Sequence, residues 1–157
     1  MTNTSHLEAK ELRYFMNQFF AALVAHREAL NMLNVYPVPD GDTGTNMSMT
    51  AESVVNALKE IPEEAEITEI TSSIAHGSLM GARGNSGVIL SQVLRAFSSE
   101  VGISGVLDAS STARGLSEAA KAAYGAVMTP VEGTILTVVR ESSEAAEKAY
   151  EEAKYSA

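Results

Sequence analysis

The chain has 157 residues, of which 45% are hydrophobic and 20% are charged, a composition typical of one globular domain. The absence of Cys excludes a disulfide framework, a thiolate zinc site and a Cys nucleophile, and the formal net charge of -9 argues against broad contact with nucleic acid. Because no apolar stretch is long enough to span a membrane and no secretion signal is recognisable, we expect a cytoplasmic protein.

Residues 7–32 are predicted to form the first helix. Its inward face carries apolar side chains near helical spacing, namely Leu12, Phe15, Phe19, Leu23 and Leu30. His26 lies on the same helix without a carboxylate or a second His at ligand spacing, so we assign it an ordinary packing or surface role.

The loop after this helix holds two of the three Asp residues of the chain, Asp40 and Asp42. Pro37 and Pro39 restrict the backbone in front of them, which predicts a rigid loop rather than a helix. Carboxylate oxygens are the ligands that Mg²⁺ prefers, so this loop is a candidate magnesium site.

A second helix is predicted to begin at about residues 43–46 and to end near Lys59. Gly41 and Gly44 are expected to let the backbone turn tightly and approach a ligand. The free N–H groups of the first helical turn point back toward the two carboxylates, and an anion belongs at such a helix end. Carboxylates for a metal beside backbone donors for a phosphate predict a magnesium-nucleotide site.

Pro62 separates this helix from a third one over about residues 67–79. Acidic residues surround the break, namely Glu60, Glu63, Glu64, Glu66 and Glu69. We interpret them as a solvated turn and a helix start that negative charge stabilises.

Residues 81–87 form a second glycine cluster, and an apolar helix over residues 88–97 follows it. Asn85 and Ser86 stand where a helix N-cap would stand, which makes this a second helix start able to accept an anion. The cluster matches neither the Walker pattern nor the dinucleotide fingerprint. Because neither glycine loop contains Lys, a bound nucleotide would need metal ions, backbone dipoles and Arg83 to neutralise its phosphates.

Residues 98–107 are predicted to form a loop because they contain Gly102 and Gly105. Asp108 is a good N-cap, and we expect it to open a fifth, Ala-rich helix that runs to about Met128. Its role is therefore interpreted as structural.

Gly125 lies near the end of that helix and leaves room for a flat base. After a short loop over residues 129–134, a last amphipathic helix is predicted from Ile135 to the end of the chain. About six helices without a period-2 pattern predict an all-α bundle.

Two stretches resemble a known family. The first is residues 34–47, Asn-Val-Tyr-Pro-Val-Pro-Asp-Gly-Asp-Thr-Gly-Thr-Asn-Met, and the second is residues 81–92, Gly-Ala-Arg-Gly-Asn-Ser-Gly-Val-Ile-Leu-Ser-Gln. Together they resemble the ATP-binding subunit of dihydroxyacetone kinase, the DhaL type. They also resemble the N-terminal domain of the bacterial fatty acid kinase catalytic subunit. The double proline is similar to the fatty acid kinase branch, as is Pro-Val-Glu-Gly-Thr at 130–134. The resemblance implies an antiparallel barrel of about eight helices, so we expect residues 1–157 to form a single domain of this type that lacks the last two helices.

The resemblance also implies roles for individual residues. Asp40 and Asp42 would act in catalysis by binding two magnesium ions. Asn34 stands nearest to a third, metal-binding Asp of the dihydroxyacetone branch, and its amide oxygen can coordinate. We add Arg83 as a candidate catalytic residue that stabilises charge on the transferring phosphoryl group.

Other residues would hold the nucleotide itself. Those expected to meet its phosphates are Thr43, Gly44, Thr45 and Asn46 from one helix start and Gly84, Asn85 and Ser86 from the other. Gly125, Thr134 and Ile135 would flank the adenine and ribose.

In this interpretation the domain uses ATP and Mg²⁺ to phosphorylate an acceptor held by a DegV-type fatty-acid-binding protein, giving an acyl phosphate and ADP. A fatty carboxylate is already ionised at neutral pH, so no strong general base is required. Any homodimer would form through domains that this chain lacks. The alternatives left open are phosphorylation of dihydroxyacetone and a nucleotide-binding piece without activity of its own.

Two other protein classes use an Asp-x-Asp sequence. An EF-hand loop that starts at Asp40 is disfavoured because its sixth position would be Thr45 rather than Gly and its twelfth Ala51 rather than Glu. An aspartyl-phosphate phosphatase is disfavoured because its Asp residues follow a buried strand, whereas prolines precede Asp40 here.

Overall fold

The computed structural model describes residues 6–35 and 38–156, and most of this part is helical. The helices are α1 (Ala9–Ala25), α2 (Arg27–Leu33), α3 (Thr43–Lys59), α4 (Ile67–Gly81), α5 (Gly84–Ser104), α6 (Ala109–Gly125) and α7 (Ile135–Ser156). Two short strands, β1 (His6–Leu7) and β2 (Leu107–Asp108), pair antiparallel. The predicted all-α class is confirmed. None of the helices in the described part is both long and apolar enough to cross a bilayer.

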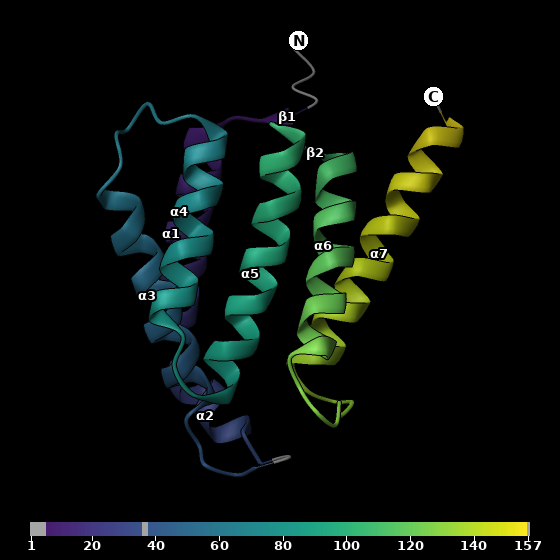
Figure 1. Ribbon diagram of the computed structural model, residues 1–157. Coiled ribbons are helices and arrows are strands. Elements are labelled where there is room, and N and C mark those ends of the chain that lie inside the picture. Colours follow the sequence, from purple (N-terminus) through teal and green to yellow (C-terminus); the bar gives the residue numbers. More distant parts are fainter. Residues whose placement is uncertain (1–5, 36–37, 157) are drawn as a thin grey trace.

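The long helices pack one after another in chain order. Helices α4, α5, α6 and α7 stand side by side and alternate in direction, while α1 and α2 pack against α3 (Figure 1). This alternation brings the starts of α3 and α5 and the loop between α6 and α7 to the same end of the bundle, the lower end in Figure 1. The two glycine clusters therefore lie at one end of the fold.

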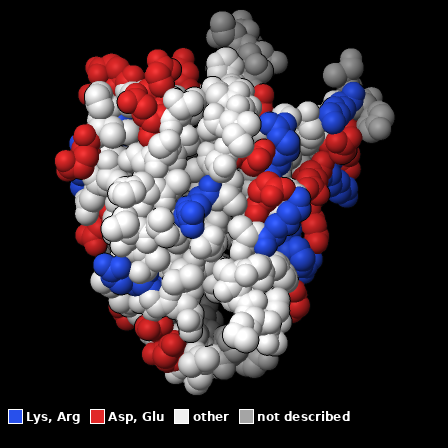
Figure 2. Space-filling view, viewed as in Figure 1, with Lys and Arg blue, Asp and Glu red and all other residues white. Residues whose placement is uncertain are grey.

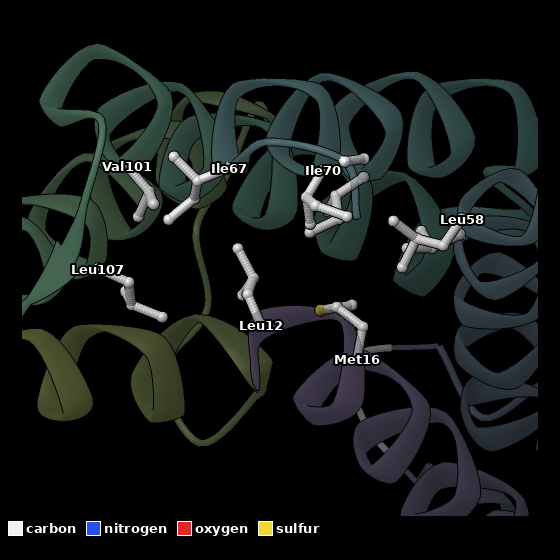
Figure 3. Packing of buried hydrophobic residues seen from close by; sticks show 10 residues of the cluster. Leu12, Met16, Leu58, Ile67, Ile70, Val101 and Leu107 are labelled. Carbon is white, nitrogen blue, oxygen red and sulfur yellow. The ribbon is translucent and has the colours of Figure 1, made fainter. Parts of the chain in front are cut away.

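The core lies between α1 and the layer of α3, α4 and α5. Leu12 and Met16 on α1 point toward Leu58, Ile70 and Val101 of the other helices (Figure 3). Burial of these side chains is the main source of stability.

One part of the predicted inward face of α1 is wrong. Leu12 and Leu23 are buried as expected, but Phe15 is 61% exposed and its neighbour Met16 only 4%. Met16 stands four positions after Leu12 and so continues the same face of the helix, whereas Phe15 lies off that face.

The predicted first helix over residues 7–32 is also two helices. The backbone leaves the helical conformation at His26 (φ -104°, ψ 7°), and α2 begins at Arg27 in a new direction. His26 is exposed there. The break turns α2 so that its last residues reach the start of α3.

The other helix boundaries agree with the prediction in part. Helix α3 begins and ends where expected, and α4 begins where expected. The predicted loop over residues 98–107 is wrong, because α5 continues to Ser104. Helix α6 ends at Gly125 rather than near Met128.

Asp108 caps α6 as predicted. Its Oδ1 accepts a hydrogen bond from the Ser111 N–H (2.8 Å), and its own N–H donates to Ser111 Oγ (2.9 Å). The bond from the Ser111 N–H lowers the pKa of the Asp108 carboxyl below its usual range.

Replacing Asp108 with Ala is expected to lower the free energy of unfolding by ~1 kcal/mol, because the helix loses its N-cap acceptor. Asp108→Asn keeps an acceptor oxygen and should remain close to the wild type. Urea denaturation followed by circular dichroism measures both. An Ala variant as stable as the wild type would show that this cap contributes nothing.

Candidate functional site

The starts of α3 and α5 are in direct contact. The Ser86 hydroxyl lies 3.3 Å from the Thr43 hydroxyl, within hydrogen-bond distance, although 43 positions separate the two residues. Thr43 is the first residue of α3 and Ser86 lies in the first turn of α5. The structure thus joins the two motifs that the sequence singled out into one site.

The start of α5 is fixed against α3 by close packing. Gly84 has a φ of 58°, and a Cβ on it would lie 2.7 Å from Asn46 Cγ, so only Gly fits here. The Arg83 N–H donates to Thr50 Oγ1 (3.3 Å), and the Thr50 hydroxyl in turn donates to the Asn46 carbonyl oxygen (2.8 Å). Gly84 and Asn46, both predicted phosphate contacts, are therefore neighbours.

The first turn of α3 leaves two backbone donors open. The Thr45 N–H donates to Asn31 Oδ1 (3.1 Å), and the Asn46 N–H donates to the Asp42 carbonyl oxygen (2.9 Å). Within residues 6–35 and 38–156, the N–H groups of Thr43 and Gly44 have no acceptor. Such groups at a helix start attract an anion.

Gly44 was expected to let the backbone turn tightly and approach a ligand, but its small size serves helix packing instead. It is buried in α3 against α2, where a Cβ would lie 2.9 Å from Leu30 Cβ and closer still to the Arg27 carbonyl oxygen. Gly44 therefore permits the close contact of two helices, and its contribution to a ligand would come from its N–H alone.

Asn34 braces the acidic loop in front of α3. Its Oδ1 accepts from the Asp42 N–H (3.3 Å), and its Nδ2 donates to the Val38 carbonyl oxygen (2.9 Å). The Asp40 N–H donates to the same Val38 oxygen (3.0 Å). The prediction for Pro37 lies outside the described residues.

The carboxylates of Asp40 and Asp42 are available to a ligand. Asp42 is the N-cap residue of α3, yet its side chain makes no capping bond. Neither carboxylate has a hydrogen-bond or ion-pair partner in the described part of the chain. The same part contains no group of three or more His, Asp or Glu side chains that could hold a metal ion.

The cap of α5 differs from the one predicted at Asn85 and Ser86. The helix begins at Gly84 with Arg83 as the N-cap residue, so Asn85 and Ser86 lie in the first turn of α5 rather than at its cap. The Arg83 guanidinium donates to the carbonyl oxygens of Ala82 (3.0 Å) and Met80 (3.5 Å) at the end of α4. In this arrangement it binds carbonyl oxygens at the end of α4.

The loop between α6 and α7, which holds the residues predicted to flank the adenine and ribose, lies at the same end of the bundle as the starts of α3 and α5 (Figure 1). Thr134 opens α7: its Oγ1 accepts from the Leu136 N–H (3.3 Å), and its hydroxyl donates to the Val131 carbonyl oxygen (2.7 Å). Gly125, the last residue of α6, is exposed, and a Cβ added to it would meet open space. Figure 2 shows the surface hollowed at this end, between the start of α5 and this loop.

A network around Glu132 holds this loop, and no sequence pattern pointed to it. The Glu132 carboxylate accepts hydrogen bonds from the Thr137 hydroxyl (2.6 Å), the Tyr124 hydroxyl (2.5 Å) and the Arg140 guanidinium (3.2 Å). These donors, Thr137 first, lower the pKa of Glu132 to about 2. The network ties the loop to the end of α6 and the start of α7.

The bonds to Glu132 predict a pH dependence of stability. Because folding lowers the pKa of Glu132 from 4.5 to about 2, its contribution is fully present above about pH 4.5 and is lost as the pH falls toward 2. The difference in urea midpoint between the wild type and Glu132→Gln should therefore stay constant from pH 7 to about 5 and shrink below about 4.5. A difference that grows on acidification would contradict the assignment.

A second hollow, of about 530 Å³, lies between α5, α6 and α7 and is less suited to phosphates. Its cations are already paired, Arg114 with Glu100 (3.4 Å) and Lys121 with Glu118 (2.6 Å). Glu147 and Glu151 add further negative charge to its wall, which would repel an anion.

Comparison with known proteins gives one family. The family model described as "DAK2 domain" matches residues 37–157. An uncharacterized protein of Staphylococcus saprophyticus is 43% identical over 148 residues, which are 94% of this chain and 27% of that protein. Protein YloV of Bacillus subtilis is 44% identical over 124 residues, which are 79% of this chain and 22% of YloV. The chain thus spans about a quarter of the length of these relatives.

Proposed function

The chain belongs to the DAK2 domain family, which is associated with kinase subunits, and from this premise we propose that it binds ATP with Mg²⁺ and transfers the γ-phosphoryl group to an acceptor held by a partner protein. Domains of this type bind ADP or ATP. The proposed acceptor is a fatty acid carried by a DegV-type protein, which would become an acyl phosphate.

The contact between Thr43 and Ser86 is the observation that carries this proposal. It sets the open N–H groups of Thr43 and Gly44 beside the first turn of α5, so that two positive helix ends are neighbours. A triphosphate is an anion large enough to meet both. The carboxylates of Asp40 and Asp42, which have no partner among the described residues, directly precede the first of these helix ends.

The donor set fits a magnesium ion. Two carboxylates without protein partners in the described residues supply hard, negatively charged oxygens, and Mg²⁺ is held in such sites by one or two carboxylates together with phosphate oxygens and water. Asp40 and Asp42 would hold it, while Asn34 orients the loop through the Asp42 N–H. When bound, the ion would neutralise negative charge on the phosphates.

The protein's own part in the transfer is positioning. The N–H groups of Thr43 and Gly44 and the hydroxyl of Ser86 would orient the phosphates, and the braced loop at Thr134 would flank the nucleoside. In the reaction an oxygen of the fatty carboxylate forms a bond to the γ-phosphorus, the bond from that phosphorus to the bridging oxygen breaks, and ADP leaves. Since the carboxylate is already ionised, no protein base has to remove a proton.

Acyl phosphate formation tests the proposal. The chain is incubated with ATP, Mg²⁺ and a fatty-acid-loaded DegV-type protein, and the product is trapped with hydroxylamine as the hydroxamate. We expect product only when all components are present. Dihydroxyacetone in place of the loaded protein tests the other acceptor, and ATP binding without transfer to either would leave only a nucleotide-binding domain.

A further inference from the structure

Asn31 at the end of α2 forms a pair of hydrogen bonds with one residue of the site. Its Oδ1 accepts from the Thr45 N–H (3.1 Å), and its Nδ2 donates to Thr45 Oγ1 (3.0 Å). Both residues are partly buried. No motif pointed to Asn31, because its partner lies 14 positions away on another helix.

The orientation of the Asn31 amide follows from its partner. The Thr45 N–H can only donate, so the amide oxygen must face it, and the amide NH₂ must then face the Thr45 hydroxyl. An NH₂ group can only donate, so the Thr45 oxygen accepts and its own proton points elsewhere. The Thr45 N–H is also occupied, which leaves the N–H groups of Thr43 and Gly44 as the open backbone donors of this turn in the described part of the chain.

We propose that Asn31 is a positioning residue for the nucleotide: it acts through Thr45 by turning that hydroxyl into a donor for a phosphate oxygen. This inference rests on the proposed function, since it assigns a phosphate oxygen as the acceptor of the Thr45 proton. Asn31 itself contacts Thr45 rather than the nucleotide.

Replacing Asn31 with Asp isolates this effect, because the two side chains have the same shape. One Asp oxygen still accepts from the Thr45 N–H, but the other cannot donate, so the Thr45 hydroxyl must turn its proton toward position 31. We expect Asn31→Asp to keep the melting temperature of the free protein and to weaken Mg-ATP binding by about tenfold or more, the loss typical of one hydrogen bond to a charged group.

A double-mutant cycle separates this mechanism from simple charge repulsion. Thr45→Val should weaken Mg-ATP binding to a similar extent, whereas Thr45→Ser should bind Mg-ATP as the wild type does. In the Thr45→Val background, Asn31→Asp should cause little further loss of Mg-ATP affinity. Asn56→Asp places the same extra charge at an exposed position of α3 and should bind as the wild type. Calorimetric titration with Mg-ATP measures all of these variants.

Three outcomes overturn the inference while leaving the proposed function intact, provided that the wild type binds Mg-ATP. The first two are wild-type affinity of Asn31→Asp and wild-type affinity of Thr45→Val. The third is a loss of affinity from Asn31→Asp that is equally large in the wild-type background and in the Thr45→Val background. Failure of the wild type itself to bind Mg-ATP would instead refute the proposed function on which the inference rests.

Discussion

Gly44→Ala is expected to lower the free energy of unfolding by about 3 kcal/mol, the largest stability effect among the predictions made from this fold. A Cβ at this position would lie 2.9 Å from Leu30 Cβ and closer still to the Arg27 carbonyl oxygen, so α2 and α3 would have to separate. Backbone atoms cannot move aside as a flexible side chain can. Urea denaturation followed by circular dichroism measures the change.

Gly125→Ala is the matched control for this prediction. Gly125 also lies in a helix, but a Cβ on it would meet open space. Ala has the higher helix propensity, so this variant should be as stable as the wild type or more stable by up to about 1 kcal/mol. If Gly44→Ala were equally stable, the close contact of α2 with α3 would be wrong.

Asp42→Asn is expected to weaken Mg-dependent ATP binding by on the order of 100-fold, because even residues that only support a metal ligand typically contribute 10–100-fold to metal affinity. The Asp42 side chain makes no capping bond, so the melting temperature of the protein without ATP should not change. Calorimetric titration with ATP at fixed Mg²⁺ concentration gives the affinity, and differential scanning fluorimetry gives the melting temperature.

Asp108→Asn makes the same chemical change at the opposite end of the bundle, where Asp108 caps α6. It should bind ATP with wild-type affinity. Equal binding by Asp42→Asn and the wild type would remove Asp42 from the metal site, and a large drop in its melting temperature would mean that the side chain is structural after all.

The sequence allowed the prediction of elements whose signals are local. Helix α3 follows from an apolar period between the Asp-rich loop and Lys59, and the cap of α6 from an Asp placed before an Ala-rich run. The break at His26 and the extension of α5 to Ser104 have no such local signal. Gly102 suggested a loop, but it lies inside α5, where a Cβ would come within 2.9 Å of Thr71 Oγ1 on α4.

The candidate site also contains residues that could be predicted from the sequence and residues that could not. The two glycine clusters could be identified from the sequence, and their contact through Thr43 and Ser86 fits the expected neighbourhood of two helix starts. Asn31 and the Glu132 network could not be identified, because their partners lie on other helices or across a loop. Arg83 was proposed from its charge alone, whereas its direction depends on the carbonyl groups at the end of α4.

The assignment of the nucleotide site is tested most directly by amide chemical shifts of the ¹⁵N-labelled chain on titration with Mg-ATP. Amide signals of Thr43, Gly44 and Ser86 should shift most, because the open N–H groups and the hydroxyl at the two helix starts would meet the phosphates. Unchanged signals at these residues, with the large shifts confined to the hollow that Arg114 and Lys121 line, would contradict the site.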